Sequence, residues 1–302
     1  MCLRGVYLTR MAEMPFALRA RCDWKLRTRS IPLGERTVVM GVLNTTPDSF
    51  SDGGAFDSPA AAIEHGLRMF EEGADIVDIG GESTRPGKHK PVGIREEIDR
   101  VLPVLKGILR HHPGAILSID TYKSQTATAA LEAGVEIVND VSGFLWDKSM
   151  AQVCAGARCG VVLMNTRGRP EEWHALPPVD PDRVVPIVKE ALRQRRDDAL
   201  KAGIAQQQIV LDPGFGFGII AEQNYSLLAG LDELIILGHP LLAGVSRKGF
   251  LGKNVPADRR GNASLAAVTA TILAGAHLVR VHDVRPSREA AAIADAILAA
   301  SI

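Results

Sequence analysis

The stretch VVMGVLNTTPDSFSDGG, residues 38–54, decides the fold. Its first six residues, Val38–Leu43, are apolar, as expected for a strand that is buried on both faces of a sheet. A dense polar segment follows and ends in Gly53 and Gly54. This segment is longer than the roughly 2–6 residues that ordinarily connect a strand to a helix. A buried strand that opens into a long polar loop favours a functional rim over a simple turn.

The same change from an apolar run to a helical segment recurs along the chain. The apolar runs are Val38–Leu43, Ile76–Ile79, Ala115–Ile119, Ile137–Val138, Gly160–Met164, Ile209–Leu211, Pro240–Gly244 and Leu278–Val281. The segments with helical period are Pro59–Glu72, Ile94–Arg110, Ser124–Ala133, Lys148–Ala155, Asp182–Ala202, Gln223–Ala229, Ser264–Leu273 and Ser287–Ala300. This alternation predicts an α/β fold, a (β/α)8 TIM barrel. A doubly wound open sheet is the alternative, but the even rhythm of eight units favours the barrel.

Glycines mark the ends of several predicted helices, and the N-terminal residues lie outside the repeating pattern. The helix-ending glycines are Gly73, Gly134, Gly203 and Gly275, each at a C′ position. Trp24–Arg29 and Ile31–Thr37 predict a small hairpin around a Leu-Gly-Glu turn, which would cover one end of the main fold. We expect residues 1–23 to form an irregular extension and residues 24–302 a single barrel domain with no fused second enzyme.

Composition limits the classes of function. The chain has 302 residues, of which 46% are hydrophobic, and its 35 Lys and Arg balance its 35 Asp and Glu. A net charge of zero provides no global field toward nucleic acid or an anionic membrane, so a small anion must be bound by local cations. The four cysteines lack CxxC spacing, and no apolar run reaches the roughly 20 residues of a membrane span. These features predict a cytoplasmic protein with free thiols.

Polar residues accompany the ends of all eight predicted strands. They are Asn44, the run Gly81–Gly87, Asp120, Asn139 with Asp140, Asn165, the run Asp212–Gly214, the run Ser246–Lys248, and Arg280 with His282. In a parallel barrel these ends meet at the C-terminal mouth, where active sites lie. One such residue is usually a helix cap or a turn residue. Eight together predict a ligand site at the mouth.

The residue types suggest what this site binds. The carboxylates of Asp120 and Asp212, with the amide of Asn139, suit a ligand edge that carries adjacent N–H donors, such as an aminopyrimidinone.

A group of cations, Arg85, Lys248, Arg280 and His282, requires an anion. The loops after the last two strands of such barrels often bind phosphate, and the amide end of the last helix, predicted at Ser287, could assist. Asn44 could supply a neutral oxygen to a hydrated Mg²⁺ nearby.

Five motifs in the chain resemble those of dihydropteroate synthases. The motifs are NTTPDSFSDGG (44–54), GGESTRPG (80–87), LDPGFGFG (211–218), SRK (246–248) and RVHD (280–283). The resemblance runs from about Val38 to the C-terminus. It implies a homodimeric (β/α)8 barrel that uses Mg²⁺ and is sensitive to sulfonamides, which mimic 4-aminobenzoate. The implied reaction is the condensation of (7,8-dihydropterin-6-yl)methyl diphosphate with 4-aminobenzoate to 7,8-dihydropteroate and diphosphate.

The resemblance also implies roles for individual residues. The implied pterin-binding residues are Asp120, Asn139, Asp212 and Lys248, and the implied contacts to the substrate and its diphosphate are Thr84, Arg280 and His282. Phe50, Pro86 and Ser246 would line the 4-aminobenzoate pocket, Asn44 would contact Mg²⁺, and Arg85 would lie over the departing diphosphate. The loops 45–54 and 82–87 resemble two mobile loops that close over the site.

Asp120, Arg85 and Lys248 are the expected catalytic residues. Diphosphate departs only when its charge is neutralised, and a carboxylate can stabilise the pterin cation that is left. The arylamine is neutral and needs no base before its attack. Positioning and exclusion of water therefore matter more than a protein nucleophile.

Three features depart from the family pattern. Met164-Asn165 stands where Met-His is frequent, Ile219 stands where a Lys is common, and the residues before Trp24 have no match.

Two other functions share parts of this pattern. A pterin-dependent methyltransferase domain has no use for a diphosphate site. Arg85, the TPDSFSDGG loop (46–54) and Arg280 with His282 argue against it. A non-catalytic pterin-binding paralogue would be favoured by loss of Asn44, Arg85 or Lys248, and all three are present. The expected partners are the two small-molecule substrates and a second copy of the chain, with neither nucleic acid nor membrane.

Overall fold

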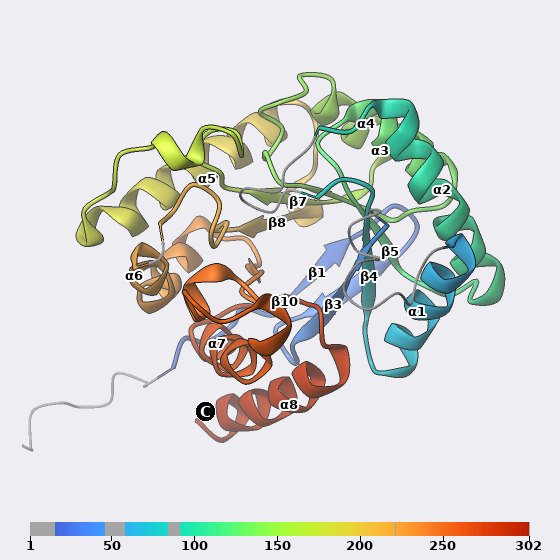
Figure 1. Cartoon of the computed structure of the whole chain (residues 1–302). Coiled ribbons are helices and arrows are strands. Elements are labelled where there is room, and N and C mark those ends of the chain that lie inside the picture. The colour runs from blue at the N-terminus through green and yellow to red at the C-terminus, as the bar shows by residue number, and fades with distance from the viewer. Residues whose placement is uncertain (1–15, 46–57, 84–90, 221, 302) are drawn as a thin grey trace, which may run out of the picture.

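A barrel of parallel strands forms the centre of the protein in the computed structural model, which describes residues 16–45, 58–83, 91–220 and 222–301 (Figure 1). The barrel strands are β3 (Val38–Asn44), β4 (Ile76–Gly80), β5 (Leu117–Asp120), β6 (Ile137–Asp140), β7 (Gly160–Met164), β8 (Ile209–Asp212), β9 (Leu242–Ala243) and β10 (Leu278–Val281). Their order in the sheet is β8-β7-β6-β5-β4-β3-β10-β9. A parallel bridge between Leu211 and Leu241 joins the two edges. The predicted TIM barrel is confirmed, and the open sheet is excluded.

Helices surround the barrel (Figure 1). They are α1 (Pro59–Glu71), α2 (Ile94–His111), α3 (Ser124–Glu132), α4 (Met150–Ala157), α5 (Val184–Lys201), α6 (Gln223–Ala229), α7 (Gly261–Leu273) and α8 (Val284–Ala300). Gly73, Gly134, Gly203 and Gly275 have φ values of 99°, 109°, 96° and 99°, which confirms them as left-handed helix ends. The last helix begins at Val284, earlier than the predicted Ser287. Its first turn therefore follows His282 almost directly.

An antiparallel hairpin, β1 (Cys22–Lys25) and β2 (Ser30–Leu33), covers one end of the barrel. The predicted turn at Leu-Gly-Glu is wrong, because the chain reverses between Leu26 and Arg29, where the amide of Leu26 donates to the Arg29 carbonyl at 2.8 Å. Gly34 and Glu35 follow the second strand instead. The buried Trp24 packs on the barrel's inner residues, and its indole donates to the Gln208 carbonyl at 2.9 Å. The hairpin thus closes the end opposite the mouth.

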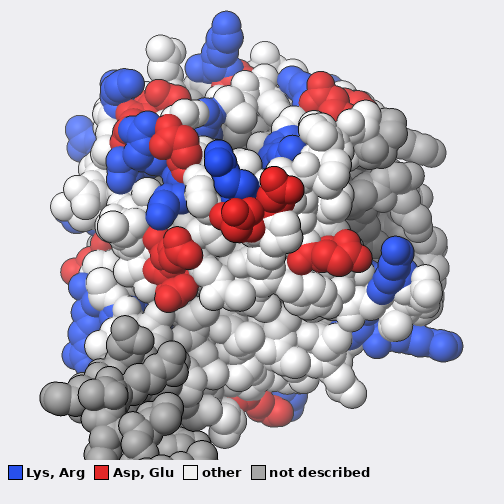
Figure 2. All heavy atoms as spheres, turned by 90° about the vertical axis from the view of Figure 1, so that its left-hand side faces the viewer, with Lys and Arg blue, Asp and Glu red and all other residues white. Residues whose placement is uncertain are grey.

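Charges of both signs are interspersed on the face shown in Figure 2. On α5, Arg193 pairs with Glu190 and Asp197 at 2.6 Å and 3.0 Å. The described part of this face therefore carries no broad patch of a single sign. No helix of the described residues is long and apolar enough to cross a membrane. Cys22, Cys154 and Cys159 are free thiols, as expected.

Candidate active site

The alternation of side chains along the strands puts polar groups at one end of the barrel interior. Because inward positions recur every second residue, a polar residue lies inward when it stands two positions after an inward apolar one. The buried inner cluster includes Ile76, Ile137, Val210 and Leu278, and two residues further along these strands stand Asp78, Asn139, Asp212 and Arg280. The barrel interior is therefore apolar further back along the strands and polar at their C-terminal ends, which form the mouth.

Arg280 joins two carboxylates across the mouth. Its Nε donates to Oδ2 of Asp78 at 2.6 Å, and its Nη2 donates to Oδ2 of Asp120 at 2.6 Å. Asn139 donates from Nδ2 to the same Oδ2 of Asp78 at 2.9 Å. Asp78 is fully buried, and its Oδ1 has no partner among the described residues. The Asp78 carboxylate thus orients both the guanidinium and the amide.

The two carboxyls predicted to hold the ligand have raised pKa values. Burial raises the pKa of Asp120 to about 7; Arg280 opposes this rise, whereas the nearby Asp78 charge adds to it. Burial also raises the pKa of Asp212 to about 6, against a hydrogen bond from the Gly214 amide and the charges of Lys248 and Arg280. Carboxyls that titrate near neutral pH at a cavity are typical of functional sites.

A small inner cavity collects these groups. It is lined by Asp120, Asn139, Val141, Met164, Asp212, Phe215, Phe217, Gly244, Lys248 and Arg280. Oδ1 of Asp212 accepts a hydrogen bond from the Gly214 amide at 2.8 Å. A Cβ at Gly244 would lie 3.8 Å from Oδ2 of Asp212, so the glycine leaves room beside this oxygen. Acceptors and apolar rings suit a flat heterocycle with N–H donors.

A larger cavity of about 570 Å³ adjoins the inner one and shares Asp120, Phe217, Gly244, Lys248 and Arg280 with it. Its wall also includes Asn44, Ser246 and His282. The Ser246 hydroxyl lies 3.1 Å from Nδ1 of His282 and accepts from the His282 amide at 3.2 Å.

Lys248 lies at the junction of the two cavities. Its Nζ is 3.9 Å from the centre of the Phe217 ring, a cation–π contact. A Cβ at Gly216 would lie 3.5 Å from Cδ of Lys248, so the glycine-rich run after β8 also packs on the lysine stem.

The structure brings together the predicted residues that it describes. These are Asn44, Asp120, Asn139, Asp212, Ser246, Lys248, Arg280 and His282, all of which line one or both cavities. Phe50, Thr84, Arg85 and Pro86 lie outside the described residues.

Asp78 is a site residue that sequence reasoning missed. It lies in the run Ile76–Ile79, which is otherwise apolar. A charged residue in a strand buried on both faces must be paired, and it therefore signals a polar partner inside the barrel. The partner here is Arg280.

The two departures from the family pattern have different surroundings. Asn165 is buried, and its amide donates to the Pro213 carbonyl at 3.1 Å. Ile219 lies in the wall of the larger cavity.

Comparison with known proteins agrees with this arrangement. The family model described as "Pterin binding enzyme" matches residues 40–282. The chain belongs to this family of pterin-binding enzymes. It is 40% identical to the dihydropteroate synthase of Clostridium beijerinckii over 277 residues, which cover 91% of this chain and 99% of that protein.

Solved structures agree as well. The dihydropteroate synthase of Xanthomonas albilineans with 4-aminobenzoic acid is 39% identical and has a TM-score of 0.84, covering 93% of this chain and 99% of that one. The Yersinia pestis enzyme in a sulfonamide complex is 37% identical with a TM-score of 0.86, covering 92% and 100%. Pterin-binding enzymes that act as dihydropteroate synthases are thus the relatives of this chain over nearly its whole length.

Proposed function

We propose that this protein is a transferase of folate biosynthesis. It condenses (7,8-dihydropterin-6-yl)methyl diphosphate with 4-aminobenzoate and yields 7,8-dihydropteroate and diphosphate. The observation that carries this proposal is the inner cavity lined by Asp120, Asn139, Asp212 and Lys248, adjoining a larger cavity that contains Ser246. A structure of the related Xanthomonas albilineans enzyme with 7,8-dihydropteroate, the product of joining the two halves, supports it.

The inner cavity would bind the pterin. Asp212 has an oxygen beside Gly244 that can accept hydrogen bonds from the ring N–H and exocyclic amino groups. Asn139 is fixed by its bond to Asp78, which leaves its carbonyl oxygen as an acceptor. The apolar Phe217 and the stem of Lys248 would flank the ring.

The chemical step breaks the bond between the pterin methylene carbon and a diphosphate oxygen. The electron pair leaves with diphosphate, and the nitrogen of 4-aminobenzoate then bonds to the methylene carbon and loses a proton. Asp120, beside Arg280, would stabilise the positive charge on the pterin. Thr84, Arg85, Arg280 and His282 are the proposed contacts to the diphosphate, and Asp120, Arg85 and Lys248 the proposed catalytic residues.

The larger cavity would bind 4-aminobenzoate. Ser246 lies in its wall, and Phe50 and Pro86, outside the described residues, complete this part of the proposal. Sulfonamides would occupy the same place in this protein, and the Yersinia pestis relative has been solved in a sulfonamide drug complex. They are expected to compete with 4-aminobenzoate.

The proposal includes Mg²⁺. Mg²⁺ keeps several waters and binds substrate phosphates, so it needs few protein atoms. Asn44, half-buried in the cavity wall, would supply a neutral oxygen. When bound, the ion would offset the negative charge of the diphosphate.

The remaining parts of the proposal rest on the resemblance to the family and on composition. We propose a cytoplasmic homodimer whose catalytic unit is the barrel of residues 24–302. Its ligands would be small molecules, not nucleic acid or membrane.

Formation of the product tests the function directly. The purified protein with both substrates and Mg²⁺ should produce 7,8-dihydropteroate, identified by its mass. Lys248→Met should reduce the rate at least about tenfold, because it removes a cation that adjoins both cavities. Absence of the product from the wild-type protein would overturn the proposed function.

A further inference from the structure

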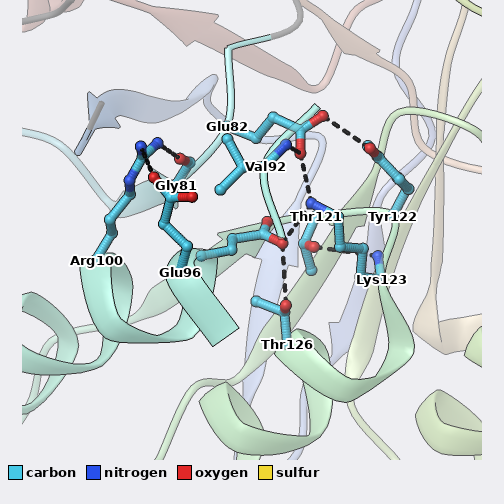
Figure 3. A network of polar contacts seen from close by, with 10 residues as sticks. Gly81, Glu82, Val92, Glu96, Arg100, Thr121, Tyr122, Lys123 and Thr126 are labelled. Carbon is cyan, nitrogen blue, oxygen red and sulfur yellow. Dashed lines mark hydrogen bonds and ion pairs between the residues drawn. The ribbon is translucent and has the colours of Figure 1, made fainter. Parts of the chain in front are cut away.

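A buried ionic network lies beside the mouth, between the end of β4, α2 and the start of α3 (Figure 3). Nζ of Lys123 forms ion pairs with the carboxylates of Glu82 and Glu97, the latter at 2.8 Å. The side chains of the two glutamates are 3% and 1% exposed. Buried carboxylates without a cation are strongly destabilising, and Lys123 offsets the charge of both glutamates.

Glu82 connects the two ends of the chain segment 83–91. Its Oε2 accepts a hydrogen bond from the Val92 amide at 3.0 Å, and its Oε1 accepts one from the Tyr122 hydroxyl at 2.7 Å. The residue before this segment is thus bonded to the residue after it, and Glu82 is itself bonded to Tyr122 and Lys123, which follow β5 (Figure 3). The segment contains Thr84, Arg85 and Pro86.

The backbone just before Glu82 is held equally closely. Nη1 of Arg100 donates to the Gly81 carbonyl at 2.8 Å, and Arg100 also pairs with Glu96 (Figure 3). A Cβ at Gly81 would lie 2.9 Å from Cγ of Glu97, so the close approach of the backbone at position 81 to Glu97 requires glycine. The chain therefore leaves β4 in one fixed direction over α2.

The network also borders the larger of the two cavities. Glu82 lines the larger cavity, and Lys123 stands three residues after Asp120 in the sequence. Thr126, on α3, donates to Oε2 of Glu97 at 3.0 Å and so helps to hold the carboxylate that pairs with Lys123. The lining of the inner cavity, as far as the described residues form it, includes none of the three charged residues of the network.

We propose that Lys123 is a positioning residue for the reaction. With Glu82 and Glu97 it fixes the wall of the larger cavity at Glu82, and through Glu82 also Val92, relative to Asp120. This inference rests on the proposed function. It assigns Lys123 to the diphosphate and 4-aminobenzoate half of the site and not to the binding of the pterin ring.

The test uses Lys123→Met, which removes the charge and keeps most of the stem. Lys189→Met is the matched control, because Lys189 forms an ion pair with Glu233 at 3.8 Å on the surface. For each protein we would measure kcat, the KM for both substrates, the Kd for the pterin alcohol (6-hydroxymethylpterin) and the hydrogen exchange of a peptide containing Val92. Tyr122→Phe, which removes one hydrogen bond to Glu82, serves as a milder second variant.

We expect Lys123→Met to lower kcat/KM for the arylamine substrate at least tenfold, to change the Kd for the pterin alcohol less than twofold, and to speed exchange at Val92. Tyr122→Phe should shift the same kinetic constant in the same direction by a smaller factor, and Lys189→Met should shift none. Unchanged kinetic constants in both network variants, or an equal loss of pterin affinity, would overturn the positioning role. If the wild-type protein forms no product, the proposed function fails, while the exchange at Val92 still tests whether Lys123 anchors the segment.

Discussion

Nε of Arg280 lies 2.6 Å from Oδ2 of Asp78 inside the barrel, and the Asp78 carboxylate is fully buried. This contact joins β10 to β4, and the second bond of the guanidinium reaches Asp120 on β5. Burial alone would lower the pKa of Arg280, but the two carboxylates raise it above its ordinary value. Arg280 therefore remains a fixed positive charge at the mouth of the barrel.

Replacement of Asp78 should damage the site more than the fold. In Asp78→Asn the guanidinium of Arg280 loses one of its two anionic partners. The orientation of Asn139 is also no longer fixed by a carboxylate. We expect the Kd for the pterin alcohol, measured by calorimetry, to rise at least about tenfold, and the free energy of unfolding to fall by about 1–3 kcal/mol.

Asp75→Asn is the matched control for this substitution. Asp75 precedes the same strand at its opposite end, where it pairs with Arg36 at 2.7 Å and accepts from the Val39 amide at 2.9 Å. Its replacement should lower stability but leave the Kd within about twofold. Equal effects of the two variants on pterin binding would refute the assignment of Asp78 to the site.

Binding of the pterin should weaken as the pH falls. Its N–H donors require an ionised Asp212, whose pKa is about 6 in the protein without ligand. The pterin would also lie beside Asp120, whose pKa is about 7. Both carboxyls are ionised at pH 8 and become protonated between pH 7 and pH 5, so the affinity is lost in that window. Below pH 6 the affinity should fall by up to about tenfold per pH unit.

The variant Asp212→Asn provides the comparison for this pH profile. It should bind weakly at pH 8 and lose less further affinity by pH 5 than the wild-type protein, because only Asp120 still titrates in this window. An affinity of the wild-type protein that stays constant from pH 8 to pH 5 would contradict the role of these carboxylates.

The hydroxyl of Ser246 should affect the second substrate selectively. It lies in the wall of the larger cavity and 3.1 Å from Nδ1 of His282. Ser246→Ala should raise the KM for the arylamine substrate about threefold to tenfold, the value of one hydrogen bond. Ser246→Thr, which keeps the hydroxyl, should restore most of the loss. A selective effect on the KM for the pterin substrate would speak against this placement.

Trp24 should matter for stability and not for chemistry. It is 1% exposed, packs on the end of the barrel opposite the mouth, and lies outside the described walls of both cavities. Trp24→Ala should lower the free energy of unfolding by about 3–5 kcal/mol. Denaturant titration measures this loss, and kcat per folded molecule at low temperature should stay within about twofold. A large loss of kcat in fully folded Trp24→Ala protein would contradict a purely structural role for Trp24.

The strand–helix rhythm was enough to predict the barrel, because hydrophobic period and chain order are local properties. Gly160–Met164 and Leu278–Val281 agree with the structure at both ends. The hairpin turn was misplaced because Leu33-Gly34-Glu35 has the composition of a turn, whereas the actual reversal at 26–29 contains no glycine.

The ligand groups at the strand ends were also predictable, since every strand of a parallel barrel presents its C-terminal end at the same mouth. Asp120 and Asp212 lie there as expected. The partners of these groups were not predictable. The pairing of Asp78 with Arg280, and that of Lys123 with Glu82, join segments that are far apart in sequence, and only the closed barrel shows that they meet.

The release of diphosphate in the presence and absence of 4-aminobenzoate tests the central claim most directly. The protein would be incubated with the pterin diphosphate and Mg²⁺, and diphosphate and 7,8-dihydropteroate would be measured in the same samples. We predict that 4-aminobenzoate raises diphosphate release and that one diphosphate appears for each dihydropteroate formed. Pterin binding without diphosphate release under either condition would contradict the proposed reaction and indicate a binding protein without catalysis.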